Sequence, residues 1–174
     1  MRSQSKPKGF DWLQGKKLEK VNLGNALATI ACRLFKIAAL AGSRAILEQP
    51  SSSLMWAFQA FKDLHESVKG WFGNRDVCLD GAPWKKPTSF YANDKAITTI
   101  SGTCKCTSDI MHIALTGKCE RTGENWTKIA GPYWHGTVRT VEKPFHEYSM
   151  LGKDAVTCIK AGVGVIVPSP FSHS

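Results

Sequence analysis

The hydrophobic positions between residues 22 and 41 recur at steps of three or four residues. This spacing is typical of one face of a helix, and it involves Leu23, Leu27, Ile30, Leu34, Ile37 and Ala41. Asn22 is a residue type that caps helix starts, and Gly42 is one that ends helices in the left-handed conformation. The pattern therefore predicts a helix that begins near Asn22 and ends at Gly42.

A short apolar run follows directly after that helix. Residues 44–47, Arg-Ala-Ile-Leu, have the length and character of a buried strand in a parallel sheet. Pro50 is expected to end the strand, and the three serines after it can cap a second helix. Apolar residues then continue at helical spacing up to Gly70, at Leu54, Met55, Phe58, Phe61, Leu64 and Val68. This order is half of a βαβ arrangement, so we expect an α/β fold.

The character of the sequence changes after residue 74. Short β-prone segments separated by Gly, Pro and Asn are expected at residues 76–79, 89–92 and 97–100. Residues 162–167 fit either one more strand or appended sequence with no role in the fold. The chain is thus divided into a basic arm or linker at residues 1–20, an α/β domain at residues 21–145, and a tail of uncertain structure at residues 146–174.

The composition is that of a globular protein with an excess of positive charge. The 174 residues suffice for one domain with a core, and 43% of them are hydrophobic and 21% charged. The formal net charge is +9, and six of the 23 basic residues lie between Arg2 and Lys20. Such an excess favours polyanionic partners, nucleic acid first, because neutralising phosphates releases counterions.

The sequence favours an intracellular protein, nuclear or cytoplasmic. No stretch reaches the roughly 20 apolar residues that we expect of a membrane helix. Residues 1–20 lack the apolar run and cleavage site of a secretory signal. In a reducing compartment the six cysteines are expected to be thiols or metal ligands rather than disulfides.

Glu48 stands directly after the predicted strand, at the place where α/β folds bind ligands. Its carboxylate can accept hydrogen bonds from an amino group or a protonated ring nitrogen. Pro50 would fix the turn, and the start of the next helix would offer free backbone N–H groups. The alternative is that Glu48 is a solvated loop acid and the serines only cap the helix.

A second group of polar residues lies between residues 80 and 90. A Gly-x-Pro turn at Gly81 leads through Trp84, Lys85 and Lys86 into the next predicted strand. Basic side chains beside a tryptophan can hold a phosphate or stack on a base. The alternative is an ordinary loop whose lysine ammonium groups extend into water.

Six short motifs follow one another along residues 20–140. They are Gly24-Asn25-Ala26-Leu27-Ala28, Glu48-Gln49-Pro50-Ser51-Ser52-Ser53-Leu54-Met55-Trp56, Gly81-Ala82-Pro83-Trp84-Lys85-Lys86-Pro87-Thr88, Cys104-Lys105-Cys106 with His112, Leu115-Thr116-Gly117, and Thr127-Lys128-Ile129-Ala130-Gly131-Pro132-Tyr133. In this order they resemble a family of methyltransferase-like sequences from eukaryotic mobile elements and protists. That family is in turn similar to cytosine-5 DNA methyltransferases.

The resemblance implies a partial Rossmann-like methyltransferase sheet, its C-terminal half, with short strands after residue 75. It also implies S-adenosylmethionine as the cofactor and nucleic acid as the partner. Glu48 would be the catalytic residue that contacts the target base. The implied substrate-binding residues are Gln49, Pro50, Ser52, Ser53, Trp84, Lys85 and Lys86.

The chain departs from the family at two points. Gln49 replaces the usual asparagine and is one methylene longer. The glycine-rich loop for the methyl donor and the Pro-Pro-Cys loop, which precede the first helix in the family, are not found. We therefore expect a fragment that is inactive alone and works with a separate N-terminal half, or a degenerate mobile-element remnant. An apolar helix face and a sheet edge should then be uncovered.

Four residues within a short span could bind a metal ion. Cys104, Cys106, His112 and Cys119 supply the Cys₃His set that tetrahedral zinc accepts, and Cys78 is a spare. The second function hypothesis is accordingly a non-catalytic, basic nucleic-acid-binding module stabilised by zinc. The alternative is that Cys104 and Cys106 share one strand face as small buried hydrophobes, beside a half-buried His112.

Overall fold

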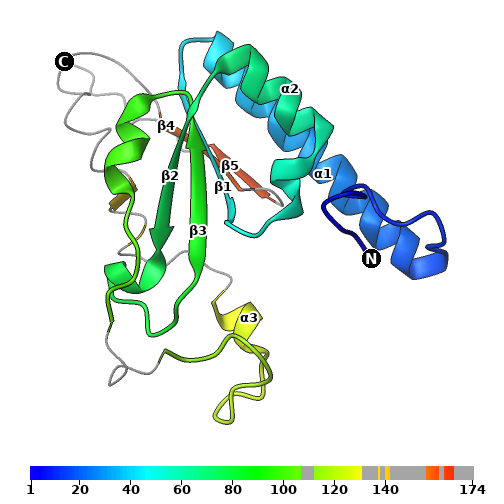
Figure 1. Cartoon of the computed structure of the whole chain (residues 1–174), viewed down its shortest axis with the longest axis vertical. Coiled ribbons are helices and arrows are strands. Elements are labelled where there is room, and N and C mark those ends of the chain that lie inside the picture. Colours follow the sequence, from blue (N-terminus) through cyan, green and yellow to red (C-terminus); the bar gives the residue numbers. More distant parts are fainter. Residues whose placement is uncertain (107–111, 131–136, 138–139, 142–155, 161–162, 167–174) are drawn as a thin grey trace.

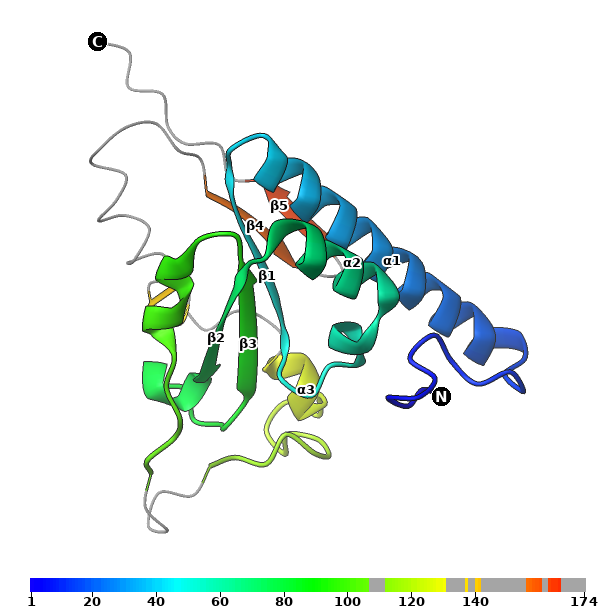
Figure 2. The same ribbon diagram turned by 45° about the horizontal axis from the view of Figure 1, so that its top comes forward.

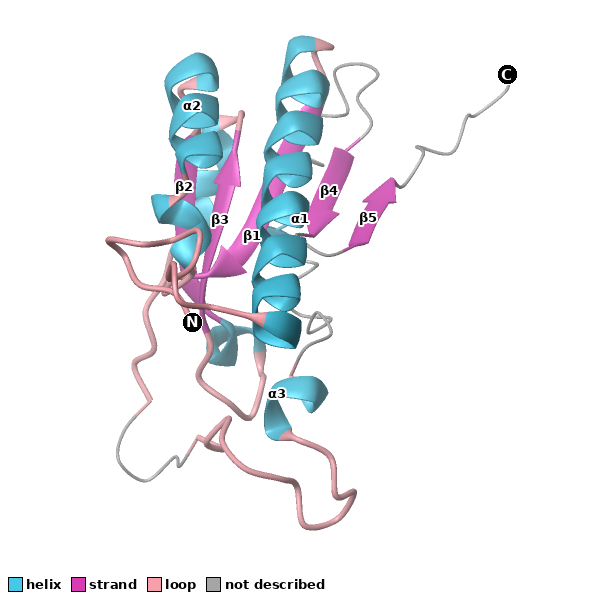
Figure 3. Ribbon diagram, turned by 90° about the vertical axis from the view of Figure 1, so that its right-hand side faces the viewer, coloured by secondary structure: helices cyan, strands magenta, loops and turns pink. Residues whose placement is uncertain are grey.

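A five-stranded sheet with two helices on one face forms the body of the protein (Figure 1). The computed structural model describes residues 1–106, 112–130, 137, 140–141, 156–160 and 163–166. The strand order is β2-β3-β1-β4-β5. Helices α1 and α2 lie side by side on the same face of this sheet (Figure 3). The chain is therefore a mixed α/β protein.

Helix α1 spans Gly15–Leu40, so the predicted start near Asn22 is wrong. Residues 16–20, Lys-Lys-Leu-Glu-Lys, are mostly strong helix formers, and they carry the helix back through part of the expected arm. The predicted end is confirmed. Gly42 has a φ of 75°, and the N–H of Ser43 reaches back to the carbonyl oxygen of Ala38 at 3.0 Å.

The apolar stripe that defined this helix in the sequence faces away from the core. Leu23 and Ile37 are each 63% exposed, and Ile30 and Leu34 are also exposed. The core-facing residues are smaller on average: Val21, Ala28, Ala31, Cys32 and Phe35. Helix α1 is apolar around most of its circumference. The three-to-four-residue spacing therefore predicts a helix there but does not show which face packs against the sheet. The expected burial of Cys32 is confirmed.

By length and composition alone, α1 could also cross a membrane. The most apolar 18-residue stretch of α1 has a mean hydropathy of 1.4. We did not expect a stretch of this kind from the sequence. The core helix of a soluble protein passes the same test. Here α1 contacts β1, β4 and α2. The expectation of no membrane partner stays a prediction.

The next segment follows the predicted order closely. Strand β1 spans Arg44–Pro50, so Pro50 is its last residue, and helix α2 spans Gln59–Val68. Between them lies a short 3₁₀ turn, Leu54–Ala57, whose first N–H groups are capped by Ser53: its Oγ accepts a hydrogen bond from the Met55 N–H at 3.3 Å. The predicted apolar face of this region is buried at Met55, Phe58, Phe61 and Leu64.

Two predicted strands are wrong and one is confirmed. Strand β2 spans Trp71–Asp76, and the predicted strand at residues 76–79 is mainly a 3₁₀ turn, Val77–Asp80. The predicted strand at residues 97–100 belongs to another such turn, Lys95–Ile100, in which Ile97 and Ile100 are both buried. A spacing of three places side chains on one side of a 3₁₀ turn. The strand predicted at residues 89–92 is β3, Pro87–Ala92.

The sheet is mixed rather than parallel. Strand β3 runs antiparallel to both β1 and β2, so β1 and β2 are parallel to each other and α2 joins them in a crossover. Strand β4, Val156–Lys160, pairs in parallel with β1, and β5, Val163–Ile166, pairs antiparallel with β4. The βαβ prediction is confirmed, and part of the predicted tail strand at residues 162–167 lies in this sheet.

The side of the sheet beneath α1 and α2 is packed around Tyr91. Its side chain is fully buried, and its ring packs against Phe35, Phe61 and Phe72. The hydroxyl accepts a hydrogen bond from the Gly70 N–H at 2.9 Å. On the other face of the sheet, the Lys95–Ile100 turn packs against β2 and β3.

We expect Tyr91→Phe to lower the free energy of unfolding by about 1 to 3 kcal/mol, because the buried Gly70 N–H loses its acceptor. Urea denaturation measures the change. As a control, Ser67→Ala removes a hydroxyl that bonds only to the Leu64 carbonyl within α2, and it should have a smaller effect. Equal losses in the two variants would contradict this role of Tyr91.

Candidate functional site at one end of the sheet

The carboxyl ends of β1 and β2 and the start of β3 lie at the same end of the sheet (Figure 2). The register pairs Pro50 with Thr88 and Asp76 with Pro87. The turn at residues 50–53 and the loop at residues 81–86 therefore meet there. These two segments contain most of the predicted substrate-binding residues.

Glu48 lies inside β1, opposite Phe90 in the antiparallel register, and is only 5% exposed. The alternative of a solvated loop acid is therefore wrong. Because side chains alternate along a strand, Glu48 shares the face of Ile46 and points away from α1 and α2. Burying a carboxylate costs free energy unless its oxygens accept hydrogen bonds or pair with a charge, so Glu48 is an unusual residue for the interior of a strand.

The turn after Glu48 is braced by its own polar side chains. Gln49 Oε1 accepts a hydrogen bond from Ser53 Oγ at 3.0 Å, and the Pro50 carbonyl accepts one from Trp56 Nε1 at 3.2 Å. Ser52 is exposed. The predicted capping role of the serines is thus confirmed for Ser53, and Gln49 holds the turn.

Polar residues that the sequence analysis missed join this turn to the other two strands. Ser89 Oγ on β3 lies 2.6 Å from Asn74 Oδ1 on β2 and 2.9 Å from Ser51 Oγ. The Ser51 N–H donates to the Pro87 carbonyl at 3.0 Å. No spacing in the sequence reveals this network, because strand register alone brings the three side chains together.

The basic loop contributes two lysines in different settings. Lys85 has a half-exposed side chain, and its Nζ lies 3.9 Å from Asp76 Oδ2. Lys86 Nζ donates to the carbonyl of Ala130, just after the short helix α3, Trp126–Ile129. Trp84 is 8% exposed and packs with Val77, Ala82 and Ala130. Its ring is therefore a packing element, and Lys85 is the more accessible lysine for a phosphate.

A cluster of three thiols and one imidazole lies at the end of β2. The ligand atoms of Cys78, Cys104, Cys106 and His112 all lie within 4.8 Å of one another. The group includes the spare Cys78 and does not include Cys119, whose role as the fourth ligand stays a prediction. Residues 104–106 form no strand. The alternative that Cys104 and Cys106 share one face of a strand is therefore wrong. The cluster is a possible metal-binding site.

Cys119 lies in a separate turn, away from this cluster. Its N–H donates to the Glu124 carbonyl at 2.8 Å, and the Gly123 N–H donates back to the Cys119 carbonyl at 2.8 Å. Hydrogen bonds from Thr122 lower the pKa of the Cys119 thiol below its usual value. The residues of the last predicted motif beyond Ala130 lie outside the described part of the chain.

The thiols of the cluster differ in acidity. Hydrogen bonds from the backbone and side chain of Cys106 lower the pKa of Cys104. Burial, with a contribution from the nearby Cys104, raises the pKa of Cys78 to about 12. A lowered thiol pKa favours the thiolate, which is the form that binds metal ions.

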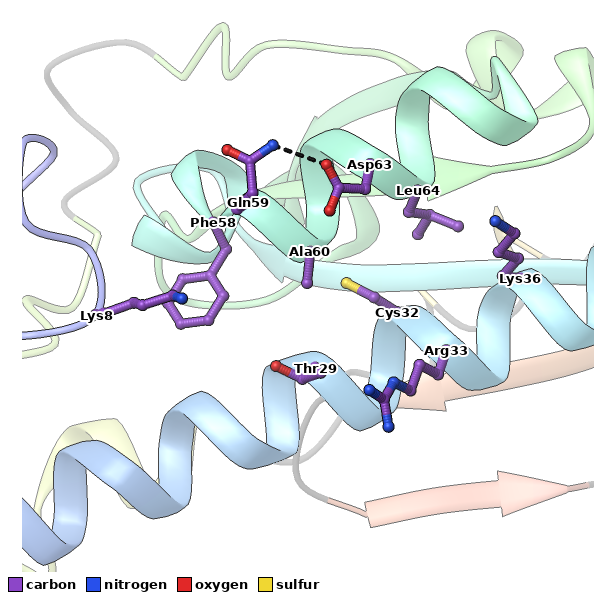
Figure 4. A pocket seen from close by; sticks show the side chains of 10 residues that line it. All are labelled: Lys8, Thr29, Cys32, Arg33, Lys36, Phe58, Gln59, Ala60, Asp63 and Leu64. Carbon is purple, nitrogen blue, oxygen red and sulfur yellow. Dashed lines mark hydrogen bonds between the residues drawn. The ribbon is translucent and has the colours of Figure 1, made fainter.

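A cavity of about 390 Å³ lies between α1 and α2 (Figure 4). Cys32 points into it from α1, and Lys8, Arg33 and Lys36 make its lining basic. The helices cover one face of the sheet and Glu48 points to the other. The cavity is therefore separate from the site at the sheet end.

Comparisons of the chain with family models, with curated proteins and with solved structures found no match. A function for the chain therefore rests on its own residues, its fold and the resemblance of its motifs.

Proposed function

We propose that the chain is part of an S-adenosylmethionine-dependent nucleic-acid methyltransferase-like domain and is inactive without the remainder. The observation that carries the proposal is the buried Glu48 at the carboxyl end of β1, within a β1-α2-β2 crossover. Ligands of Rossmann-like α/β sheets bind outside the carboxyl ends of the strands. The order of the six motifs supplies the reaction class.

In this proposal the residues at the sheet end bind and orient nucleic acid. The carboxylate of Glu48 accepts hydrogen bonds from the target base, and Lys85 offers a charge to a neighbouring phosphate. Gln49 and Ser53 hold the turn that carries Glu48. Methyl transfer needs donor and acceptor at near-attack distance. S-adenosylmethionine would be held by a separate N-terminal half, and it supplies the methyl group when bound.

The uncovered face of α1 supports a requirement for that second half. Leu23, Ile30, Leu34 and Ile37 are exposed and recur at steps of three, four and seven residues. Thr29, Arg33 and Lys36 line the cavity toward α2, so the exposed stripe lies on a different side of the helix from the cavity. An exposed apolar stripe of this kind marks a protein interface. A further helix packed along it would bury the stripe.

The test is isothermal titration with S-adenosylmethionine of the chain alone and of a fusion that restores a methyltransferase N-terminal half. We expect binding by the fusion only, and we expect Glu48→Gln in the fusion to keep donor binding while lowering methyl transfer. Tight binding by the isolated chain would contradict the need for a second half. A fusion that folds but binds no donor would overturn the methyltransferase proposal.

A second candidate is a non-catalytic nucleic-acid-binding module stabilised by zinc, favoured by the net charge of +9 and the Cys/His cluster. It predicts DNA binding that weakens steeply with salt. Lys85→Ala should reduce the log–log salt slope by about one unit, whereas Glu48→Gln should leave the affinity unchanged. A loss of affinity in Glu48→Gln would favour base contact instead. A remnant without selected function would show neither effect.

A further inference from the structure

Three separate segments bring the Cys/His cluster together. Cys78 comes from the Val77–Asp80 turn directly after β2. Cys104 and Cys106 follow Gly102, whose N–H donates to the Asn74 carbonyl at 2.8 Å and whose carbonyl accepts from the Asp76 N–H at 3.1 Å. The cluster is thus arranged by the edge of the sheet rather than by local spacing along the chain.

His112 comes from a third described segment, which begins at residue 112. The neighbouring Ile113 N–H donates to the Pro83 carbonyl at 2.9 Å, and His112 Nε2 lies 3.7 Å from Cys104 Sγ. In a tetrahedral zinc site with Zn–S bonds of about 2.3 Å, ligand atoms are roughly 3.8 Å apart. The observed limit of 4.8 Å between any two ligand atoms is therefore close to a bound geometry.

Neighbouring groups support thiolate ligands at this place. The Cys106 N–H donates a hydrogen bond to Cys104 Sγ, with the nitrogen 3.4 Å from the sulfur. Asp76 Oδ2 accepts a hydrogen bond from the Cys104 N–H at 2.7 Å, which fixes the backbone that carries the ligand. Three thiolates and one imidazole around a divalent ion carry a net charge of −1, and the ion pair of Lys85 with Asp76 lies beside the ligand-bearing backbone of Cys104.

The donor set selects the class of ion. Thiolate sulfur and imidazole nitrogen suit zinc, whereas magnesium and calcium require oxygen ligands. Four protein ligands also fill a tetrahedral coordination sphere and leave no position for a reactive water, which is the arrangement of structural sites.

We propose that Cys78, Cys104, Cys106 and His112 bind one zinc ion in a closed structural site. The ion joins residues 104–106 and His112 to Cys78 at the end of β2, near Lys85. This inference goes beyond methyl transfer and does not depend on it, because a structural ion at this position is compatible with either proposed function.

The experiment is metal analysis of the reduced full chain, followed by replacement of zinc with Co²⁺. We expect one zinc per chain and, with Co²⁺, the intense visible absorption of a tetrahedral site and a thiolate-to-cobalt charge-transfer band. Cys78→Ser should weaken zinc binding by at least about 100-fold. Cys119→Ser is the matched control and should bind zinc like the unaltered chain.

The opposite results would overturn the proposal. Retention of zinc by Cys78→Ser with loss from Cys119→Ser would restore Cys119 as the ligand. A reduced chain that takes up neither zinc nor cobalt would remove the site altogether, as would a Cys78–Cys104 disulfide found by mass spectrometry of the chain isolated with thiols blocked. If Cys78→Ser fails to fold, Cys119→Ser still decides: an unchanged cobalt charge-transfer band in that variant supports the proposal, and a weaker band would restore Cys119 as a ligand.

Discussion

Replacing Asp80 by alanine is expected to lower the free energy of unfolding by about 3 to 5 kcal/mol. Its side chain is 2% exposed, and Oδ1 lies 2.8 Å from Arg75 Nη2 and 2.9 Å from Arg75 Nε. Thr137 and Thr140 also donate to this carboxylate, at 2.7 and 2.9 Å. The substitution leaves the mostly buried guanidinium of Arg75 without its carboxylate, which is the costly way to break such a pair.

Urea denaturation at neutral pH measures this loss. Asp63→Ala is the matched control, because Asp63 on α2 is exposed and accepts a hydrogen bond from the Gln59 side chain at 2.7 Å. It should change stability by less than about 0.5 kcal/mol. A loss below about 1 kcal/mol for Asp80→Ala would mean that the network contributes little.

The hydrogen bonds to Asp80 also make the stability of the protein depend on pH. Burial by itself raises the pKa of Asp80, but the hydrogen bonds from Arg75, Thr137 and Thr140 outweigh it, so the pKa lies below its usual value. The stabilisation is therefore complete above the unfolded value of about 3.9 and is lost as the pH falls through the lower folded value. Asp80→Ala should show a weaker loss of stability over that acid range.

Gly73→Ala is expected to lower the free energy of unfolding by about 3 kcal/mol, the upper end for overpacking. A Cβ at Gly73 would lie 2.3 Å from the Ile97 carbonyl oxygen and 2.9 Å from Ile100 Cγ1. The first of these atoms is backbone, so the Lys95–Ile100 turn must move away from β2 as a unit. That movement would also open the apolar contacts beneath the sheet.

The control is Gly24→Ala in α1, where the nearest atom to the added Cβ is Nη2 of the Arg2 side chain at 2.7 Å. A flexible side chain can move, and alanine favours a helix over glycine by up to about 1 kcal/mol. Thermal unfolding of both variants should separate them clearly. Equal thermal unfolding midpoints for the two variants would show that the Lys95–Ile100 turn moves to accommodate the new methyl group without a loss of stability.

The sequence predicted the fold best where strong local signals agreed. The apolar run at residues 44–47, Pro50 and the serine cap predicted β1 and the turn, and helical spacing predicted the core face from Met55 to Leu64. Strand β2 was missed because Trp71–Asp76 contains Gly73, Asn74 and two charged residues, and its pairing with β3 decides its structure. In α1, apolar residues on two faces left the buried face undetermined.

The candidate site was predictable only in part for the same reason. Glu48 was expected directly after the strand, but β1 continues to Pro50 and includes it, because pairing with β3 extends the strand beyond the apolar run. Cys78 could not be chosen over Cys119 from spacing, because the parallel bridge between Arg75 and Gly102 brings the two halves of the cluster together. Contacts of that kind depend on register, and register is not visible in a single local pattern.

The insertion of β3 between β1 and β2 has a consequence during synthesis. When a ribosome has released residues 44–76, the chain contains both flanking strands and α2 but not the strand that pairs them. Until Ala92 emerges, β1 and β2 each present unpaired N–H and C=O groups that other nascent chains can bind. Between the emergence of Asp76 and that of Ala92 both strands are thus open to pairing with other chains, and β1 stays open on its β4 side until Lys160 emerges.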